Sequence, residues 1–272
     1  MTDDMLDCEV VTTRTGARAV RDRLTGELMH PVVGPLVEAE RLYLGPSSLR
    51  ARLGQRAEPL VLLDVGLGAA SNAIAAWKVA RECGGRLEIV SFDRSLGALR
   101  IALEHPNDFG FEGDNLLAAR ALLDRGEHDA GHTHWRFVGG ALPETLELLP
   151  DGAADVVFWD PFSPRSNPSL WTMGAFRALR RVCRGGATVF TYSGATATRS
   201  AMILGGFAVG VGVPTGDNKF GTVGAVDLGD VPQPLDERWL ERVARSSAPF
   251  PEDAPTDAML QIRAATQFER RS

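Results

Sequence analysis

Residues 60–70 read LVLLDVGLGAA, and this stretch decides the fold class. Its first six residues form a mostly apolar run that is typical of a buried strand. Gly66 and Gly68 follow directly, and a helical pattern begins after them. Glycine lets the backbone approach a ligand closely, and the amino terminus of a helix offers unpaired N–H groups and positive potential. The order of strand, glycine loop and helix therefore predicts a ligand-binding α/β unit.

Apolar strand-like runs alternate with helical patterns from residue 60 onward. The expected strands span residues 60–65, 87–92, 135–138, 154–159, 187–192, 207–213 and 222–228. The expected helices span residues 73–83, 96–104, 115–125, 142–149, 173–183 and 197–204. Such alternation predicts an α/β protein with a doubly wound, mostly parallel, seven-stranded sheet, in which the last two strands form a closing pair.

The two ends of the chain differ from this pattern. Residues 1–56 contain two short strand-like runs and one helical run at about residues 34–43, and we expect an N-terminal extension, a candidate substrate-facing lid. Residues 57–229 form the expected Rossmann-like domain. Pro232 and Pro234 mark a boundary, so we expect residues 230–272 to be a helical C-terminal appendage with a polar end.

Composition limits the classes of protein. The chain has 272 residues, of which 44% are hydrophobic, as in ordinary globular proteins. It shows neither a membrane-length apolar run nor a signal peptide, so we expect a cytoplasmic protein. The net charge of −6 argues against binding of nucleic acid through bulk charge, although a local basic face is compatible with it.

The residues that commonly bind metals show no metal-site pattern. The cysteines are odd in number and far apart, at Cys8, Cys83 and Cys183. We expect buried thiols, because a zinc site or a disulfide framework needs paired spacing. The clustered histidines lie in a polar loop without ordered carboxylates, at His128, His132 and His134. We therefore expect no bound metal.

A carboxylate, Asp93, ends the strand expected at residues 87–92. In nucleotide-binding sheets an acid at this place binds ribose hydroxyls, although an aspartate in a surface turn would give the same pattern. Together with the glycine loop it indicates a nucleoside cofactor, either NAD or S-adenosylmethionine. A single glycine-rich unit led by Asp64 favours S-adenosylmethionine.

A second carboxylate, Asp160, follows the apolar strand ADVVFW at residues 154–159. Three prolines then exclude a helix and hold the backbone in extended or turn geometry, at Pro161, Pro164 and Pro168. Asp160 is therefore expected at the carboxyl end of a strand, where ligands bind in open α/β sheets. The alternative is that Asp160 only initiates a turn.

Three motifs in this order carry a resemblance to a known family. They are DVGLGAASN at residues 64–72, SFD at 91–93 and WDPFSPRSNPSLWT at 159–172. The chain resembles the methyltransferase domain of bacterial tRNA 5-methylaminomethyl-2-thiouridine methyltransferases, in the stand-alone form without the fused oxidase domain. The resemblance covers residues 29–226 and includes Tyr192, Arg199 and the region of Lys219.

The resemblance implies a class I fold and transfer of a methyl group from S-adenosylmethionine to the aminomethyl group of a tRNA wobble uridine. It implies Asp160 and Phe162 as catalytic residues. The implied cofactor-binding residues are Asp64, Gly66, Gly68, Asn72, Asp93 and Asp160. The implied substrate-binding residues are Pro161, Arg165, Asn167, Trp171 and Lys219. The chain departs from the family in having Ala70 as the third small residue of the loop and Gly140 where an acid often holds the adenine.

Two further features leave alternatives open. Phe162 and Trp171 are expected either to stack on the uracil ring or to pack in the core. The arginines spaced for one helix face form either an RNA contact or a solvated face, at Arg177, Arg180, Arg181 and Arg184. Two other functions therefore stay open: methylation of a small-molecule amine, and a non-catalytic module that binds S-adenosylmethionine or RNA.

Overall fold

The computed structural model describes residues 7–29, 34–216 and 219–268. These form two compact units, Met1–Ala141 and Leu142–Ser272, and each is described by itself. Within the described ranges no helix has both the length and the apolar character that a membrane crossing needs.

The sheet of the first unit has the strand order β5-β6-β4-β3. Its strands are β3 (Leu60–Val65), β4 (Leu87–Asp93), β5 (Glu127–Asp129) and β6 (Thr133–Gly139). β3, β4 and β6 are parallel, with Val65 opposite Phe92 and Phe92 opposite Val138. The carboxyl ends of all three strands therefore meet at one edge. β5 is a short antiparallel strand that the sequence did not indicate.

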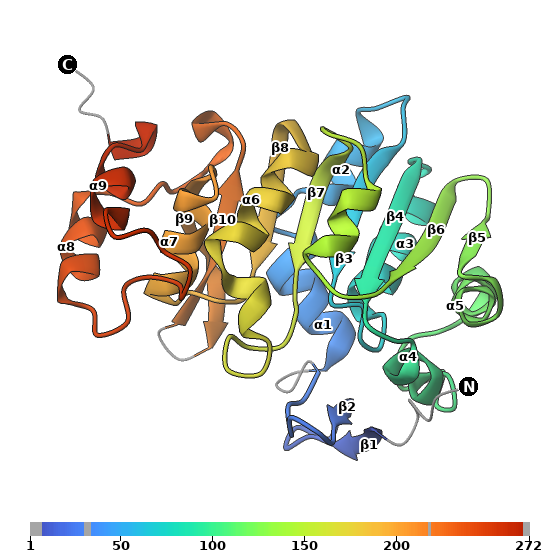
Figure 1. The fold of residues 1–272 in the computed structure, drawn as a ribbon. Helices are drawn as coiled ribbons and strands as arrows, with labels where there is room; N and C mark the ends of the chain where they lie inside the picture. The colour runs from blue at the N-terminus through green and yellow to red at the C-terminus, as the bar shows by residue number, and fades with distance from the viewer. Residues whose placement is uncertain (1–6, 30–33, 217–218, 269–272) are drawn as a thin grey trace. The chain divides into compact units, whose positions relative to one another are not determined.

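Helices complete the first unit. They are α1 (Pro35–Ala39), α2 (Leu49–Gly54), α3 (Ser71–Cys83), α4 (Gly97–Ala102) and α5 (Gly113–Arg125). The helix expected at residues 34–43 is α1 followed by a π-helical turn, Glu40–Leu44. The antiparallel hairpin of β1 (Cys8–Thr12) and β2 (Arg18–Asp22) contacts α4 (Figure 1).

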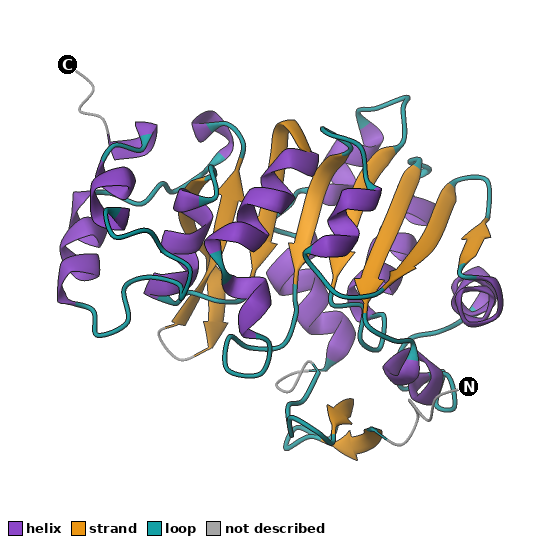
Figure 2. Ribbon diagram, viewed as in Figure 1, coloured by secondary structure: helices purple, strands orange, loops and turns teal. Residues whose placement is uncertain are grey.

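The sheet of the second unit has the order β7-β8-β10-β9. Its strands are β7 (Ala154–Trp159), β8 (Cys183–Thr191), β9 (Ala208–Gly216) and β10 (Lys219–Ala225). β7 and β8 are parallel, whereas β10 is antiparallel to both β8 and β9. The expected closing pair is thus present, and the described residues contain all seven expected strands together with β5 (Figure 2).

Two expected elements of the second unit differ from the structure. The helix expected at residues 142–149 is a 3-10 helix, Glu144–Leu148. We expected a strand to begin at residue 187, but α6 (Met173–Val182) runs directly into β8, which begins at Cys183 and includes Gly185 and Gly186. The pairing of β7 with β8 is irregular there, since Ala154 lies opposite Cys183 while Val156 already lies opposite Thr188. The glycines therefore belong to a distorted strand start and do not end the helix.

The C-terminal segment is helical, as expected, with α8 (Glu237–Arg245) and α9 (Ala258–Arg263). Hydrogen bonds join this segment to the rest of the second unit. Asp253 accepts hydrogen bonds from the Met173 and Gly174 N–H groups at the start of α6, at 2.8 and 2.7 Å. Ser200 of α7 (Thr196–Leu204) donates to the Pro249 carbonyl at 2.7 Å.

Candidate functional site

The glycine loop between β3 and α3 turns back on the end of β4. The Gly66 and Leu67 N–H groups both donate to the Phe92 carbonyl, at 3.0 and 3.1 Å. Gly66 and Gly68 have φ angles of 88° and 51°, which favour glycine. Ala70 also has a positive φ, 66°, in the place where a third glycine was expected. The loop therefore keeps a glycine-type path, and one alanine is held in it under strain.

Asp93 joins the two predicted cofactor motifs. Its Oδ2 accepts a hydrogen bond from Gly68 N at 3.0 Å, and its Oδ1 accepts one from Arg94 N at 2.7 Å. Burial raises the pKa of this carboxyl group, and the backbone N–H donors oppose the shift. Because a carboxylate has about four acceptor positions, Asp93 retains the capacity to accept ribose hydroxyls.

Asp64 lies in the interior of the first unit and is 1% exposed. Its Oδ2 accepts a hydrogen bond from Ser91 Oγ at 2.7 Å, and Ser91 Oγ accepts one from Trp135 Nε1 at 2.9 Å. This chain joins β3, β4 and β6 directly beneath the glycine loop. Asp64 therefore positions the loop, and the sequence did not reveal its partners Ser91 and Trp135. Ser91 was detectable only as a polar residue inside an apolar strand.

The first turn of α3 presents two buried polar side chains next to the glycine loop. Asn72, a predicted cofactor residue, is 2% exposed. Ser71 is 1% exposed, and its Oγ has no hydrogen-bond partner among the described residues. A buried hydroxyl without a partner is costly, and a polar ligand at the loop would satisfy it.

Met29 and Gly140 border the same loop. A Cβ atom at Gly68 would lie only 3.0 Å from Met29 Sδ, so the segment after β2 packs directly against the loop. His30 to Val33, which also carry the resemblance, lie outside the described residues. Gly140 donates its N–H to the Asp93 carbonyl at 3.0 Å with a φ of 140°. This glycine ties the end of β6 to Asp93 and supplies no carboxylate for an adenine.

In the second unit, Asp160 follows the last residue of β7 and begins a loop that two aromatic residues hold. Tyr192 Oη donates to the Pro161 carbonyl and Trp171 Nε1 donates to the Phe162 carbonyl, both at 2.9 Å. The two aromatic rings pack edge to face, with centroids 5.7 Å apart. The loop backbone therefore has a defined path. Tyr192 appeared in the sequence analysis only as part of the resemblance.

The other predicted residues of this loop differ in exposure. Trp171 is 4% exposed, which favours core packing over stacking on a base. Phe162 is half-buried, Arg165 is exposed, and Asn167 is half-buried at the start of a short 3-10 helix. Pro161 is buried, and Lys219 of β10 is exposed. Of these six predicted residues, Phe162, Arg165, Asn167 and Lys219 keep accessible surface.

A buried arginine lies next to the carboxyl end of β8. Arg199 is 6% exposed and donates from Nε to Thr222 Oγ1 at 3.1 Å and from Nη2 to the Gly221 carbonyl at 3.0 Å. Burial, with a smaller contribution from Arg242, lowers the pKa of Arg199 to about 10, so the guanidinium stays charged at neutral pH. No carboxylate of the described residues pairs with it.

The expected arginine face of α6 is not a free cationic surface. Arg184 lies in β8, where its guanidinium donates to the Ala153 carbonyl and lies 3.4 Å from Asp155. Arg181 donates to the Leu146 carbonyl at 2.8 Å, and Arg180 donates to the Gly206 carbonyl at 3.2 Å. Arg181 also forms an ion pair with Asp151. Arg177, the remaining arginine of the predicted face, is exposed on α6.

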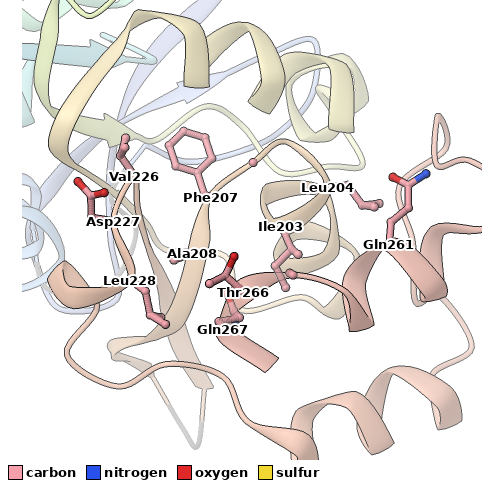
Figure 3. Close-up of a pocket in the computed structure, with 12 residues that line it drawn as sticks. Ile203, Leu204, Phe207, Ala208, Val226, Asp227, Leu228, Gln261, Thr266 and Gln267 are labelled. Carbon is pink, nitrogen blue, oxygen red and sulfur yellow. The ribbon is translucent and has the colours of Figure 1, made fainter. Parts of the chain in front are cut away.

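A pocket of about 470 Å³ lies in the second unit, and none of the predicted site residues lines it (Figure 3). The end of α7, the start of β9, the residues after β10 and the C-terminal helical segment line it. Its one carboxylate, Asp227, already accepts a hydrogen bond from Gly186 N at 2.8 Å. Because β10 runs antiparallel to β8, this pocket lies at the end of β8 opposite to Tyr192.

No disulfide joins the three cysteines, all of which lie in the part of the chain that the structure describes. Cys8 and Cys183 are buried, as expected, whereas Cys83 is half-buried. Burial raises the pKa of Cys183 to about 12, which makes it a poor nucleophile.

The known proteins that are similar to this chain agree with the family that its sequence motifs indicated. Residues 115–227 match the family described as S-adenosyl-L-methionine-dependent methyltransferase. The chain is 34% identical over 202 residues to the tRNA 5-methylaminomethyl-2-thiouridine biosynthesis bifunctional protein MnmC of Ralstonia nicotianae, covering 67% of this chain and 29% of that protein. The Burkholderia vietnamiensis protein of the same name is 32% identical over 199 residues, covering 67% and 30%. The chain thus spans about 30% of the length of these relatives.

Solved structures show the same fold. The crystal structure of MNMC2 from Aquifex aeolicus has a TM-score of 0.73 at 22% identity and covers 96% of this chain and 85% of that one. A probable spermidine synthase from Corynebacterium glutamicum has a TM-score of 0.51 at 15% identity, covering 79% and 74%. The predicted class I, mostly parallel α/β fold is confirmed, as is the resemblance to the methyltransferase domain.

Proposed function

We propose that this chain, an S-adenosylmethionine-dependent methyltransferase, methylates the aminomethyl nitrogen of a modified wobble uridine in tRNA. The observation that carries the proposal is the loop that begins at Asp160. It places a carboxylate at the carboxyl end of β7, and Tyr192 and Trp171 hold the two carbonyls that follow. An amine that is to receive a methyl group needs a hydrogen-bond acceptor that is fixed in position.

The first unit has the features of a cofactor site. The cofactor supplies a methyl group bound to a positively charged sulfur. We assign Gly66 and Gly68 to its methionine part, because these positions allow close backbone approach, and Asp93 to the ribose hydroxyls. The buried Ser71 Oγ, which lacks a partner among the described residues, fits a polar ligand at this loop. Asn72 lies in the same turn.

In the second unit we assign Asp160 to the amine. Methyl transfer to nitrogen needs a neutral amine whose lone pair is aligned with the methyl carbon, and alignment alone can lower a barrier by up to about 7–11 kcal/mol. Asp160 accepts hydrogen bonds from the amine and takes up its proton, directly or through water. We assign Phe162 to contact with the uracil ring, and Pro161 to the rigid geometry of the loop.

The proposal of tRNA as the methyl acceptor rests on the relatives, which are named as tRNA biosynthesis proteins, and on exposed cations. Arg165 and Lys219 are exposed, and either can reach a phosphate. A small-molecule amine is the second candidate acceptor. It is favoured by the net charge of −6 and by the arginines near α6, which bind backbone carbonyls and so are less available to RNA.

Purified protein incubated with labelled S-adenosylmethionine and undermodified tRNA is expected to label a wobble nucleoside. Label on a small amine but not on tRNA would contradict the proposed acceptor. In the Asp160→Asn variant we expect turnover to fall at least about 100-fold, in the range found when a positioned acid–base group is removed. Calorimetry should show unchanged cofactor binding, because Asp160 is assigned to the amine. Loss of cofactor binding in this variant would contradict its assigned role.

A further inference from the structure

The start of β10 exposes an aromatic side chain beside a lysine. Phe220 is 45% exposed, and it is the one aromatic among the large apolar side chains that the described residues expose. Lys219 is also exposed, and no carboxylate of the described residues pairs with it. The other lysine of the chain, Lys78, lies 2.7 Å from Glu112. An exposed ring thus follows, in the sequence, a cation that pairs with no carboxylate of the described residues.

This pair lies at the carboxyl end of β8. In the antiparallel register Thr222 lies opposite Thr191, the last residue of β8, so residues 219–220 extend past that end. The backbone of Phe220 contacts the turn after β8, since a Cβ atom at Gly194 would lie 2.0 Å from the Phe220 carbonyl oxygen. Tyr192, which holds the Asp160 loop, belongs to the same turn.

The backbone next to Phe220 is anchored by a buried charge. Arg199 donates to the Gly221 carbonyl and to Thr222 Oγ1, and Thr222 Oγ1 donates to the Ser193 carbonyl at 2.6 Å. Burying a charge without a carboxylate partner is costly, so we infer that Arg199 is kept there to hold the backbone at the start of β10 in place. The register of β10 against β9 shifts on both sides of Phe220, and such irregularities redirect a side chain.

We infer that Lys219 and Phe220 form a contact for single-stranded RNA, in which the Phe220 ring stacks on an unpaired base and Lys219 binds a phosphate. This inference rests on the proposed function, because the RNA would be the tRNA substrate. A rigid, exposed ring is the side chain on which unpaired bases stack, and a lysine beside it matches the phosphate backbone. Phe220 thereby adds a substrate-positioning residue to the predicted set.

The test is steady-state methylation of undermodified tRNA by the full chain. Stacking contributes about 1–3 kcal/mol per base, so Phe220→Ala is expected to raise KM for tRNA about tenfold, with kcat at saturating tRNA changed less than about twofold. Phe220→Tyr keeps a ring and is expected to restore the KM. Leu260→Ala, at a 69% exposed apolar residue of α9, is the matched control and should leave KM unchanged.

A second variant tests the cation. Lys219→Gln should make the slope of log KM against log salt shallower by about 0.7, the value for one phosphate of a single strand. An unchanged slope would remove Lys219 from the contact.

Several results would overturn the inference. These are an unchanged KM in Phe220→Ala, a failure of tyrosine to restore it, lost cofactor binding by calorimetry, or a change in sedimentation mass that marks Phe220 as a protein interface. A wild-type chain that methylates no tRNA would instead overturn the proposed function itself. Wild-type activity on tRNA with an unaffected Phe220→Ala variant would overturn the inference alone.

Discussion

The glycine loop of the first unit and the Asp160 loop of the second are held in different ways. The glycine loop is held by the carboxylate that we propose for the cofactor ribose, because Asp93 Oδ2 accepts a hydrogen bond from Gly68 N. In the Asp160 loop the neighbouring carbonyls are held by Tyr192 and Trp171. The residue that holds the glycine loop, Asp93, is therefore also the one that we assign to the cofactor. In the Asp160 loop, by contrast, the residues that hold the backbone differ from the residue that we assign to the amine.

Among the variants that test how the two loops are held, the largest effect is expected for Asp93→Asn. The change removes the charge that faces Gly68 N and the assigned ribose hydroxyls. Hydrogen bonds to charged groups contribute about 1.5–3 kcal/mol, so S-adenosylmethionine affinity should fall about 10- to 100-fold. Calorimetric titration with S-adenosylmethionine measures this affinity. Asp124→Asn, at an exposed residue of α5, is the control. Equal affinities in both variants would show that the glycine loop does not depend on Asp93.

The same carboxylate predicts a pH dependence. Burial raises the pKa of Asp93, so its protonation begins at a higher pH than that of an ordinary aspartate. Cofactor affinity should therefore fall as the pH is lowered through the raised pKa. A raised folded-state pKa also means that protonation favours the folded protein, so the stability contribution of this group is present at low pH and lost as pH rises through that value. The Asp93→Asn variant should lose both dependences.

A smaller effect is expected for Tyr192→Phe. The variant keeps the ring that packs on Trp171 and loses only the hydroxyl that donates to the Pro161 carbonyl. A lost hydrogen bond of about 1 kcal/mol should loosen the loop and lower kcat about fivefold to tenfold. Cofactor affinity should stay at the wild-type value. A drop in cofactor affinity as large as that of Asp93→Asn would mean that the two loops are not supported independently.

The smallest effect is expected for Ala70→Gly. Ala70 has a φ of 66° at the start of α3, a conformation that glycine adopts without strain. The change should raise the free energy of unfolding by about 0.5–1 kcal/mol, measured by urea denaturation. Ala73→Gly, inside the same helix, should instead lower it by about 1 kcal/mol or more. Destabilisation by both changes would show that the Ala70 conformation is not strained.

The sequence predicted the strands and the places of Asp93 and Asp160 at strand ends, but it did not reveal the residues that support them. Asp93 and Asp160 each end an apolar run, which is a local signal. Asp253, which caps α6 from the C-terminal segment, and Arg199, which anchors β10, have no such signal. The prediction that four arginines share one helix face was wrong for a related reason. Their spacing cannot show that Arg184 lies in a strand or that its neighbours bind carbonyls.

The sequence by itself determined the alternation of strands and helices, the glycine loop and the positions of the two carboxylates. These features depend on hydrophobic periodicity and on the conformational preferences of glycine and proline, which act over a few residues. Only the tertiary structure decided that Asp93 holds Gly68, that Ser91 and Trp135 hold Asp64, and that Tyr192 holds the Asp160 loop. The physical reason is that these hydrogen bonds join residues far apart in the chain, so they exist only after the strands have paired.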